Sequence, residues 1–353
     1  MLSRVAESIY WMARQVERAE NTARFLEVTL NLILDQPENL VDPWKPLVQV
    51  TADEKWFAEH YGVANQANVV QFLAFDKDYS NSMVSCLRHA RENARGVREM
   101  MSSEAFEQLN EFYHFVIESS HDAALNPTSH FFDEVRRHTL MWSGVLHATM
   151  EQDTAWHFAN VGRMLERADK TSRILDVKYF NLLPDKELVG TAIDDLQWTA
   201  LLLAVSGFEA YQRDHHHIQI EKVVDFFLFN RRFPRSVRHC VASAGWSLDE
   251  INEGCESAPK PPSGDPHLGP TSPAPDGPYA PEDRSASDRE DQQESDSLTA
   301  VKLVGSLRHR LAHTTVKEAI AGGMHEFVDS LQTDLNRIGD AVAADYFQTE
   351  LTS

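Results

Sequence analysis

The chain has 353 residues, of which 42% are hydrophobic and 25% charged, so it is long enough for a sizeable core and for roughly one to three domains. Its formal net charge of -21 argues against a general nucleic-acid binder, because neutralising phosphates requires an excess of Lys and Arg. The same charge disfavours adsorption to anionic lipid.

The number of cysteines and the length of the apolar runs indicate the cellular compartment in which the protein is expected. Cys86, Cys240 and Cys255 are too few and too scattered for a disulfide framework or a CxxC metal site, and they fit a reducing compartment. The N-terminal stretch has no unbroken apolar core of a signal peptide, and no apolar run approaches the roughly 18 residues of a membrane-spanning helix. We therefore expect a cytoplasmic protein without a membrane segment.

Apolar residues at three- and four-residue spacing, with little sustained alternation, predict helices along most of the chain. The sequence SSEAFEQLNEF, which begins at Ser102, places Ser and Glu in capping positions. Gly322 and Gly323 are expected to interrupt or kink the last helical stretch. The fold class is thus all-α, with helical segments expected at 5–34, 82–101, 106–125, 155–183, 188–205 and 300–347.

One segment, 256–297, differs from the rest in composition. It holds nine of the fifteen prolines, and ten acidic residues against three basic ones. Such a sequence buries too little apolar surface to offset the entropy of ordering, so we expect it to be disordered. Because helical periodicity resumes at Leu298, it is an insertion, and a regulatory or partner-binding role stays open.

Two stretches of the chain recur in order. The sequence RQVERAENTAR at 14–24 reappears as RMLERADKTSR at 163–173, and 69–87 matches 223–241 without a gap. The offsets of 149 and 154 imply two homologous halves that differ by a short indel. We therefore expect a multi-helix bundle with pseudo-twofold symmetry, built from a first half at 1–150, a second half at 151–255 and C-terminal helices at 298–353 that complete the second half.

On a helical wheel, the charged face of each repeated helix is interleaved with apolar residues such as Tyr10, Phe25 and Ile174. The opposite faces are apolar too, so both faces are expected to make contacts and the charged clusters to be partly or wholly buried. Only a narrow strip is expected to face water. It holds Glu20 and Glu27 in the first copy, and Asp169 and Asp176 in the second.

Each charged face carries three Arg and one Glu, and such charges are costly to bury unless they are paired. Two explanations stay open and can coexist. Other helices could contribute carboxylates to an internal salt-bridge network, or the excess arginines could form an anion pocket on the pseudo-twofold axis that binds carboxylate or phosphate. The candidate carboxylates are Glu92, Asp194, Asp195 and Glu209. The candidate site residues are Arg14, Glu17, Arg18, Asn21 and Arg24, with Arg163, Glu166, Arg167, Lys170 and Arg173.

The histidine and cysteine residues do not indicate a metal or catalytic site. The three consecutive histidines in DHHHIQIE, at 214–221, point in different directions and are typical of a polar loop between helices rather than a metal site. Cys86 and Cys240 fall at equivalent helical positions and are expected in the core. We find no glycine-rich phosphate loop and no nucleophile motif, and we predict neither a metal nor a cofactor.

Five ordered blocks, among them SRVAESIYWMARQVERAENTARFLEV, CLRHARENARGVREMMSSEAFEQLN and VGRMLERADKTSRILDVKY, resemble the alpha-E family of bacterial helical proteins. The resemblance covers the chain to about Phe347, apart from 256–297. It places the family's Glu-Arg pairs at Glu17-Arg18 and Glu166-Arg167, and it adds Arg91, Glu92 and Arg95. It also implies a genomic setting beside circularly permuted ATP-grasp proteins and transglutaminase-like proteases.

The leading hypothesis is a helical accessory protein of an ATP-grasp amide ligase, with ligase and transglutaminase-like partners, that presents the arginines to an anionic small molecule or peptide. A second hypothesis is an enzyme of the same pathway that uses Glu17 or Glu166 as acid or base. A third is a purely structural bundle.

Overall fold

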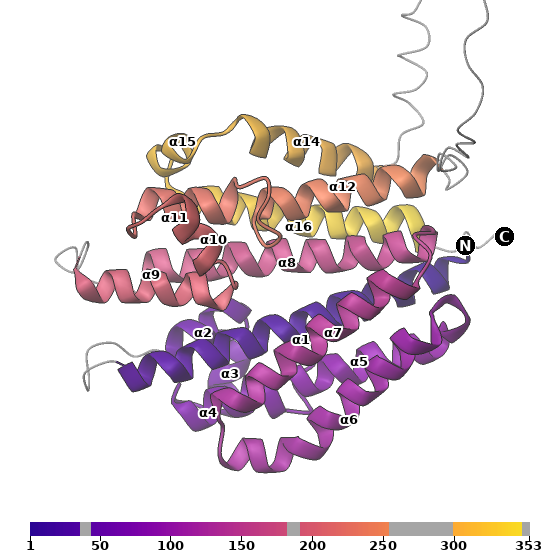
Figure 1. Cartoon of the computed structure of the whole chain (residues 1–353), viewed down its shortest axis with the longest axis horizontal. Helices are drawn as coiled ribbons and strands as arrows, with labels where there is room; N and C mark the ends of the chain where they lie inside the picture. The colour runs from indigo at the N-terminus through magenta and orange to yellow at the C-terminus, as the bar shows by residue number, and fades with distance from the viewer. Residues whose placement is uncertain (36–43, 182–190, 254–298, 348–353) are drawn as a thin grey trace, which may run out of the picture.

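The computed structural model describes residues 1–35, 44–181, 191–253 and 299–347 (Figure 1). Within these ranges the regular elements are all helices, which confirms the all-α prediction. The expected disorder of 256–297 concerns residues outside the described part of the chain.

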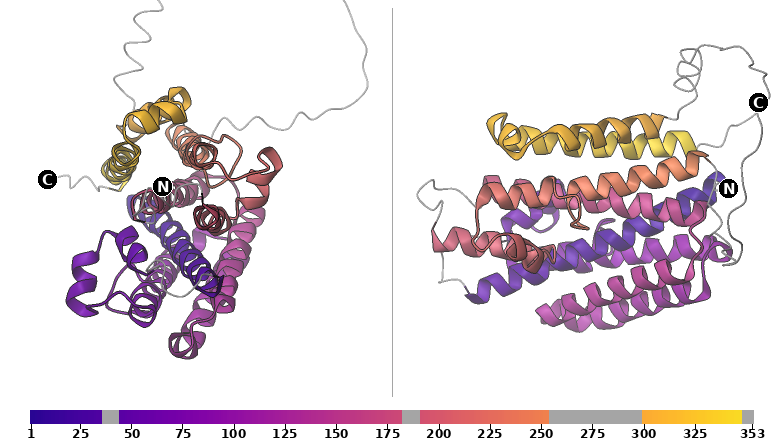
Figure 2. Two further views of the ribbon diagram at one scale, coloured as in Figure 1. Left: turned by 90° about the vertical axis from the view of Figure 1, so that its left-hand side faces the viewer. Right: turned by 45° about the horizontal axis from the view of Figure 1, so that its top comes forward.

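Two long helices occupy the centre of the bundle. α1 (Ser3–Asp35) packs along α8 (Thr154–Asn181), and both are surrounded by further helices (Figure 1). α5 (Met83–Gly96) and α7 (Ser129–Thr149) pack against α1, with α6 (Ser103–Leu125) outside them. On the other side, α12 (Val237–Glu253) and α16 (Met324–Tyr346) pack against α8, with α14 (Thr299–His313) outside them. Figure 2 shows the long helices running side by side.

Shorter elements fill the ends of the bundle. α9 (Ala192–Ala204) lies beside α1, and α11 (Ile220–Leu228) contacts α8. A π-helical turn at Gln71–Phe75 extends α4, and a 3₁₀ turn at Arg98–Met100 follows α5. The remaining helices are α2 (Lys45–Thr51), α3 (Glu54–His60), α4 (Gln66–Val70), α10 (Phe208–Asp214) and α15 (Val316–Ala321).

Local sequence signals set most helix ends. The hydroxyl of Ser102 accepts a hydrogen bond from the N–H of Ala105 and caps α6, as the sequence predicts. The expected single segment at 300–347 is wrong, because it consists of three helices. The break at Gly323, whose φ of 96° favours glycine, was foreseen. The break before α15 was not, although Thr315 and Glu318 form a capping box there.

The core consists of two apolar clusters that meet at the central helix pair. Met12, Val16 and Leu26 of α1 belong to the cluster on the α5 and α7 side. Tyr10 and Phe25, from the other face of α1, belong to the cluster built around α8. Both faces of α1 are therefore buried, as the helical wheel predicts.

Gly162 allows α8 to approach α1 closely. A methyl group at this position would lie 2.4 Å from the backbone oxygen of Tyr10, which is well inside contact distance. The glycine therefore sets the depth at which the two central helices meet, and with it the distance between their charged side chains.

Local contacts recur at the sequence offset of 154. Phe72 stacks on Tyr79 with ring centroids 4.2 Å apart, and Phe226 stacks on Phe233 at 4.4 Å. In the turns that follow these rings, the hydroxyls of Ser82 and Ser236 donate to the carbonyls of Asp76 and Asn230. The repeated sequence thus makes the same contacts twice. The division into halves at Met150, between α7 and α8, stays a prediction.

Candidate anion site at the junction of α1 and α8

The repeated Glu-Arg pairs bind each other across the two central helices. Arg18 of α1 donates from Nε and Nη2 to the two carboxylate oxygens of Glu166 of α8, at 2.7 and 2.9 Å. Arg167 of α8 donates from the same two nitrogens to Glu17 of α1, at 2.8 and 2.7 Å. Each helix therefore supplies the arginine that neutralises the glutamate of the other, in the bidentate geometry that makes such bonds strong.

Further cations complete the shell around each glutamate. Arg14 donates to Glu166 at 3.0 Å, and the Lys170 amine lies 3.6 Å from it. On the other side, Glu17 also accepts from Arg235, at 3.2 Å, and from Asn21. The side chains of Glu17 and Glu166 are completely shielded from solvent. The arginines are therefore neutralised mainly by carboxylates of the repeated helices themselves.

The prediction that Glu20 and Asp169 face water is wrong. Glu20 is 1% exposed and accepts from Arg24 and from Arg235, each at 2.6 Å. Asp169 is 7% exposed and pairs with Arg173 and Lys170. A helical wheel describes one helix in isolation. It could not show that Arg235, in the turn before α12, covers and pairs with Glu20.

Arginines control the ionisation of the buried carboxyl groups. Burial alone would raise the pKa of Glu166, but the charges of Arg18, Lys170 and Arg14 hold that pKa well below its usual value. Glu20 behaves in the same way, because Arg235 and Arg24 lower its pKa despite burial. The carboxylates therefore stay ionised in the protein interior, and Arg14, Arg18 and Lys170 share the charge of Glu166.

Two arginines are less well compensated. Burial and the nearby Arg235 lower the pKa of Arg24 to about 10, although Arg24 donates to Glu20 and, at the end of α9, to the Ala204 carbonyl. Burial and the neighbouring Arg167 lower the pKa of Arg163 to about 10. Nε of Arg163 is buried without an acceptor among the described residues. The network as a whole therefore carries an excess of positive charge.

A pocket of about 170 Å³ opens beside the network. Its charged lining comes from Arg14 and Arg18 of α1 and from Asp169, Lys170 and Arg173 of α8. Neither Glu17 nor Glu166 is among its lining residues, and an anion pocket on a pseudo-twofold axis stays a prediction. Its other lining residues are Thr22, Phe25, Leu47, Thr51, Leu73, Tyr79, Asn81 and Asn336.

The remaining predicted site residues form a separate group on α5. Glu92 lies 3.8 Å from Arg91 and 3.6 Å from Arg95, and the side chains of Glu92 and Arg95 are more than half exposed. Arg91 donates to Asn110 of α6 and lies over the Tyr113 ring. Glu92 is thus paired at the surface rather than contributing its carboxylate to the α1/α8 network.

Sequence reasoning missed Arg235 and Asn81. Asn81 accepts a hydrogen bond from Arg18 at 2.6 Å, and Arg235 bridges Glu17 and Glu20. The two occupy the same place in the repeat, because 81 and 235 differ by the offset of 154. Comparing the two repeated turns at the positions where they differ would have flagged both.

The cysteines and the three consecutive histidines lie where the sequence predicts, in the core and in a loop. Cys86 and Cys240 are fully buried, and burial raises the pKa of each thiol to about 12. His215 to His217 lie in the connection between α10 and α11. In the described ranges, no three His, Cys, Asp or Glu side chains gather as a metal site would require. None of the described helices has the length and apolar character needed to cross a membrane.

Comparison with known proteins gives one family. The Alpha-E model, described as a predicted alpha-helical domain with a conserved ER motif, matches residues 1–265 and 284–347. The chain belongs to the Alpha-E family. The Glu17-Arg18 and Glu166-Arg167 pairs are the two Glu-Arg dipeptides at which α1 and α8 bind each other. No curated protein and no solved structure matches the Alpha-E chain.

Proposed function

We propose that this Alpha-E protein binds an anionic ligand in the pocket between α1 and α8 and acts as an accessory protein of an ATP-grasp amide ligase. The observation that carries the proposal is the composition of the pocket wall. Four cationic side chains reach it, Arg14, Arg18, Lys170 and Arg173.

Charge favours an anion in this pocket. The four cations face two carboxylates, Glu166 and Asp169, so positive charge remains after every local ion pair is formed. A guanidinium has five N–H donors, and among the described residues Arg173 is hydrogen-bonded to Asp169 through Nε. Donors therefore remain for a carboxylate or a phosphate, which arginine recognises bidentately.

The rest of the wall suits an organic body attached to the anion. Phe25, Leu47 and Leu73 provide apolar surface, and Thr22 and Thr51 provide hydroxyls. Small-molecule sites combine an apolar lining with a few polar groups that fix orientation. A carboxylated or phosphorylated small molecule or peptide end fits this combination better than a bare inorganic ion.

Family membership and the genomic setting that the resemblance implies support the ligase partnership. The recurrence of contacts at offsets of 149 and 154 supports an origin of the two halves by duplication. In that case the central ion pairs also hold the halves together, so a structural role and ligand binding coexist.

The alternative of acid/base catalysis draws little support from the geometry. A general acid or base must exchange a proton near the working pH. The pKa of Glu166 is held well below its usual value by Arg18 and its neighbours, and both oxygens of Glu17 are bound by Arg167.

Titration calorimetry with phosphate monoesters and short carboxylates tests the binding proposal. We expect saturable binding that weakens at least tenfold in Arg173→Gln and Lys170→Gln. The control is Arg91→Gln, which removes the same charge away from the pocket and should bind as the unaltered protein does. Equal affinity in all four proteins would contradict the proposal.

Where an ATP-grasp protein is encoded beside this chain, reconstitution of the two proteins tests the partnership. We expect the two proteins to co-elute and ATP-dependent product formation to fall when this chain is omitted. Product formation that is indifferent to this chain would contradict the accessory role and leave the binding result standing.

A further inference from the structure

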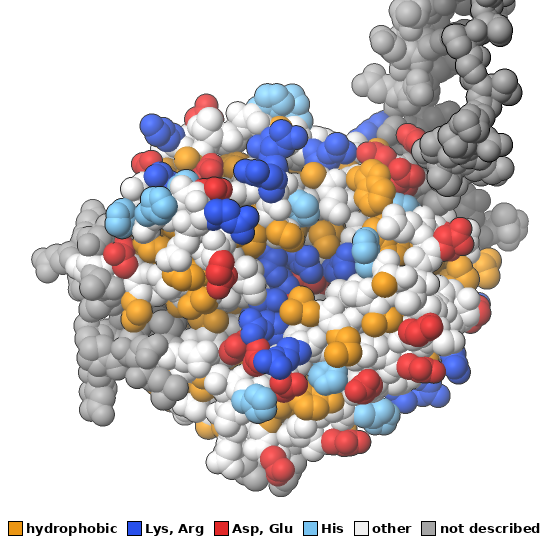
Figure 3. All heavy atoms as spheres, in the orientation of Figure 1, with side chains coloured by type: hydrophobic (Ala, Val, Ile, Leu, Met, Phe, Trp, Pro, Cys, Tyr) orange, Lys and Arg blue, Asp and Glu red, His pale blue; other side chains and the backbone are white. Residues whose placement is uncertain are grey.

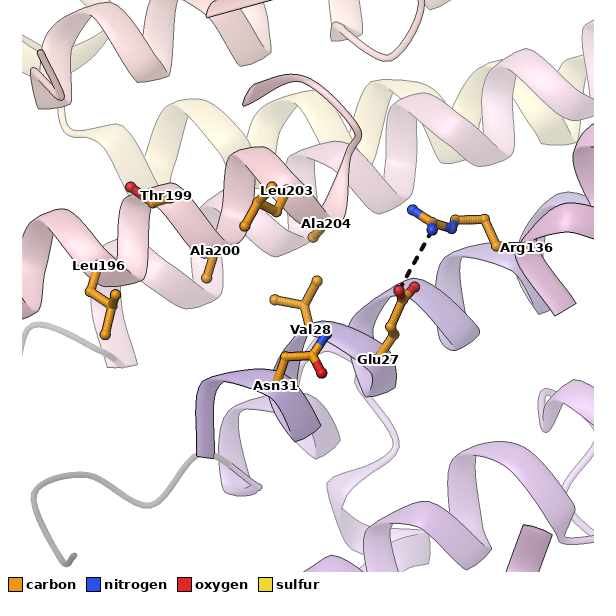
Figure 4. Close-up of a pocket in the computed structure, with 9 residues that line it drawn as sticks. All are labelled: Glu27, Val28, Asn31, Arg136, Leu196, Thr199, Ala200, Leu203 and Ala204. Atoms are coloured by element: carbon orange, nitrogen blue, oxygen red, sulfur yellow. Dashed lines mark ion pairs between the residues drawn. The ribbon is translucent and has the colours of Figure 1, made fainter. Parts of the chain in front are cut away.

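A second pocket, of about 210 Å³, lies between α1, α7 and α9 (Figure 4). It shares no lining residue with the anion pocket. Figure 4 shows the Arg136 guanidinium reaching from α7 toward the space between α1 and α9, close to Glu27. Its volume is below the range of about 300–1,000 Å³ typical of drug-sized ligands, so it suits a small guest.

One end of this pocket carries an incompletely satisfied pair of charges. Nη2 of Arg136 lies 3.6 Å from Glu27, which is longer than a hydrogen bond, and it also binds Asp133. Burial raises the pKa of Glu27, because Arg136 compensates it only in part and Asp133 opposes its ionisation. Nε of Arg136 is buried without an acceptor among the described residues. At this end Glu27 therefore has only a distant cation, Arg136, which it shares with Asp133, and the Nε–H of Arg136 has no acceptor among the described residues.

The other end is apolar. Val28 of α1 and Ala200, Leu196 and Leu203 of α9 line it. Leu196 and Leu203 are 37% and 47% exposed, which is unusual for leucine, and Figure 3 shows hydrophobic side chains gathered over α9 on this face. A guest that covers these side chains would remove apolar surface from water.

We propose that this pocket binds an aliphatic amino-acid residue that has a free α-amino group. The ammonium pairs with Glu27, the adjacent carbonyl or carboxylate oxygen accepts a hydrogen bond from the part of the Arg136 guanidinium that lines the pocket, and the side chain packs against Val28 and Leu203. A purely apolar guest would bury the charged pair without adding a hydrogen bond, and a simple acid would bring a second negative charge to the Arg136 that Glu27 already shares with Asp133. Free amino acids and peptide N-termini share the required chemistry.

Titration with L-leucine, leucinamide, N-acetyl-leucine and 4-methylpentanoate tests the proposal. We expect leucine and leucinamide to bind, and the two compounds without an ammonium to bind at least tenfold more weakly. Comparing leucine with the tripeptide Leu-Gly-Gly separates the two sources: binding of leucine alone indicates a free amino acid, and tighter binding of the tripeptide indicates a peptide N-terminus.

Two variants check the placement. Glu27→Gln removes the partner of the ammonium, and Leu203→Asp changes an exposed side chain that the fold does not require. Each should weaken leucine binding at least tenfold, whereas Lys170→Gln in the anion pocket should leave it unchanged. Absence of saturable binding by leucine and the tripeptide, or affinity unchanged in both variants, would overturn the proposal. Because anion binding is measured with other ligands, one of the two binding proposals can be contradicted while the other stands.

Discussion

The α1/α8 network and the Arg91, Glu92, Arg95 group on α5 use the same residue types at similar helical spacing, yet their environments differ. Glu166 is completely buried and takes bonds of 2.7 to 3.0 Å from two arginines of another helix. Glu92 is 58% exposed and lies 3.6 to 3.8 Å from arginines of its own helix. The comparison teaches that an arginine–glutamate motif gains structural importance from a second helix that shields and pairs it.

The largest effect is expected from Glu166→Gln. This change removes the charge that Arg14, Arg18 and Lys170 share, and it leaves buried cations without compensation. We expect the free energy of unfolding in urea to fall by about 3–5 kcal/mol. A loss no larger than that measured for Glu92→Gln would show that burial does not distinguish the two groups.

Acid should act selectively on the buried network. The pKa values of Glu166 and Glu20 in the folded protein lie below their ordinary value of 4.5, so the stability that these carboxylates contribute is present above that pH and is lost as the pH falls below it. We expect the unfolding free energy to drop below about pH 4.5, and to drop less steeply in Glu20→Gln. Urea titrations of the unaltered protein and of Glu20→Gln from pH 3 to 7 measure how the unfolding free energy depends on pH. The same pH dependence in the two proteins would contradict the role of Glu20.

An intermediate effect is expected from Gly162→Ala. The added methyl would clash with the backbone of Tyr10, separate α1 from α8 and lengthen the ion pairs. We expect the free energy of unfolding to fall by about 1–3 kcal/mol. Gly144→Ala is the matched control, since that exposed glycine of α7 has nothing within 4 Å of an added methyl and should gain up to about 1 kcal/mol from helix propensity. Thermal or urea unfolding compares the two, and an equal response would refute the close approach at Gly162.

The smallest effect is expected from Glu92→Gln. Exposed ion pairs contribute at most about 1 kcal/mol, because water already solvates both charges. Urea unfolding should therefore give nearly the value of the unaltered protein. A loss above 2 kcal/mol would mean that the α5 group, despite its exposure, is as important as the buried network.

Much of the fold could be read from the sequence. The periodicity of Tyr10 and Phe25 among the charges of α1 predicted that both faces of the helix are buried, and they are. Capping at Ser102 and the break at Gly323 follow from local chemistry. The break at Thr315 was equally local and was overlooked, because apolar spacing continues across it.

The residues of the site could be predicted from the sequence, but not which residue each of them binds. The repeated helices supplied Glu17, Arg18, Glu166 and Arg167, yet nothing in a single helix indicates that each glutamate binds the arginine of the other. Arg235 and the burial of Glu20 depend on a turn far along the chain. Both pockets, in turn, arise where three or more elements meet, which one-dimensional spacing does not encode.

The long sequence separation within these pairs affects how the chain is made. Glu17 binds Arg167 and Arg235, which are 150 and 218 residues further along. At translation rates of about 5–20 residues per second, roughly 10 to 45 seconds pass between synthesis of Glu17 and of Arg235. During that interval the charged face of α1 lacks the counter-charges that α8 and Arg235 supply, and it must stay hydrated. The central helix, although it is made first, can reach its final place only after about two thirds of the chain exists.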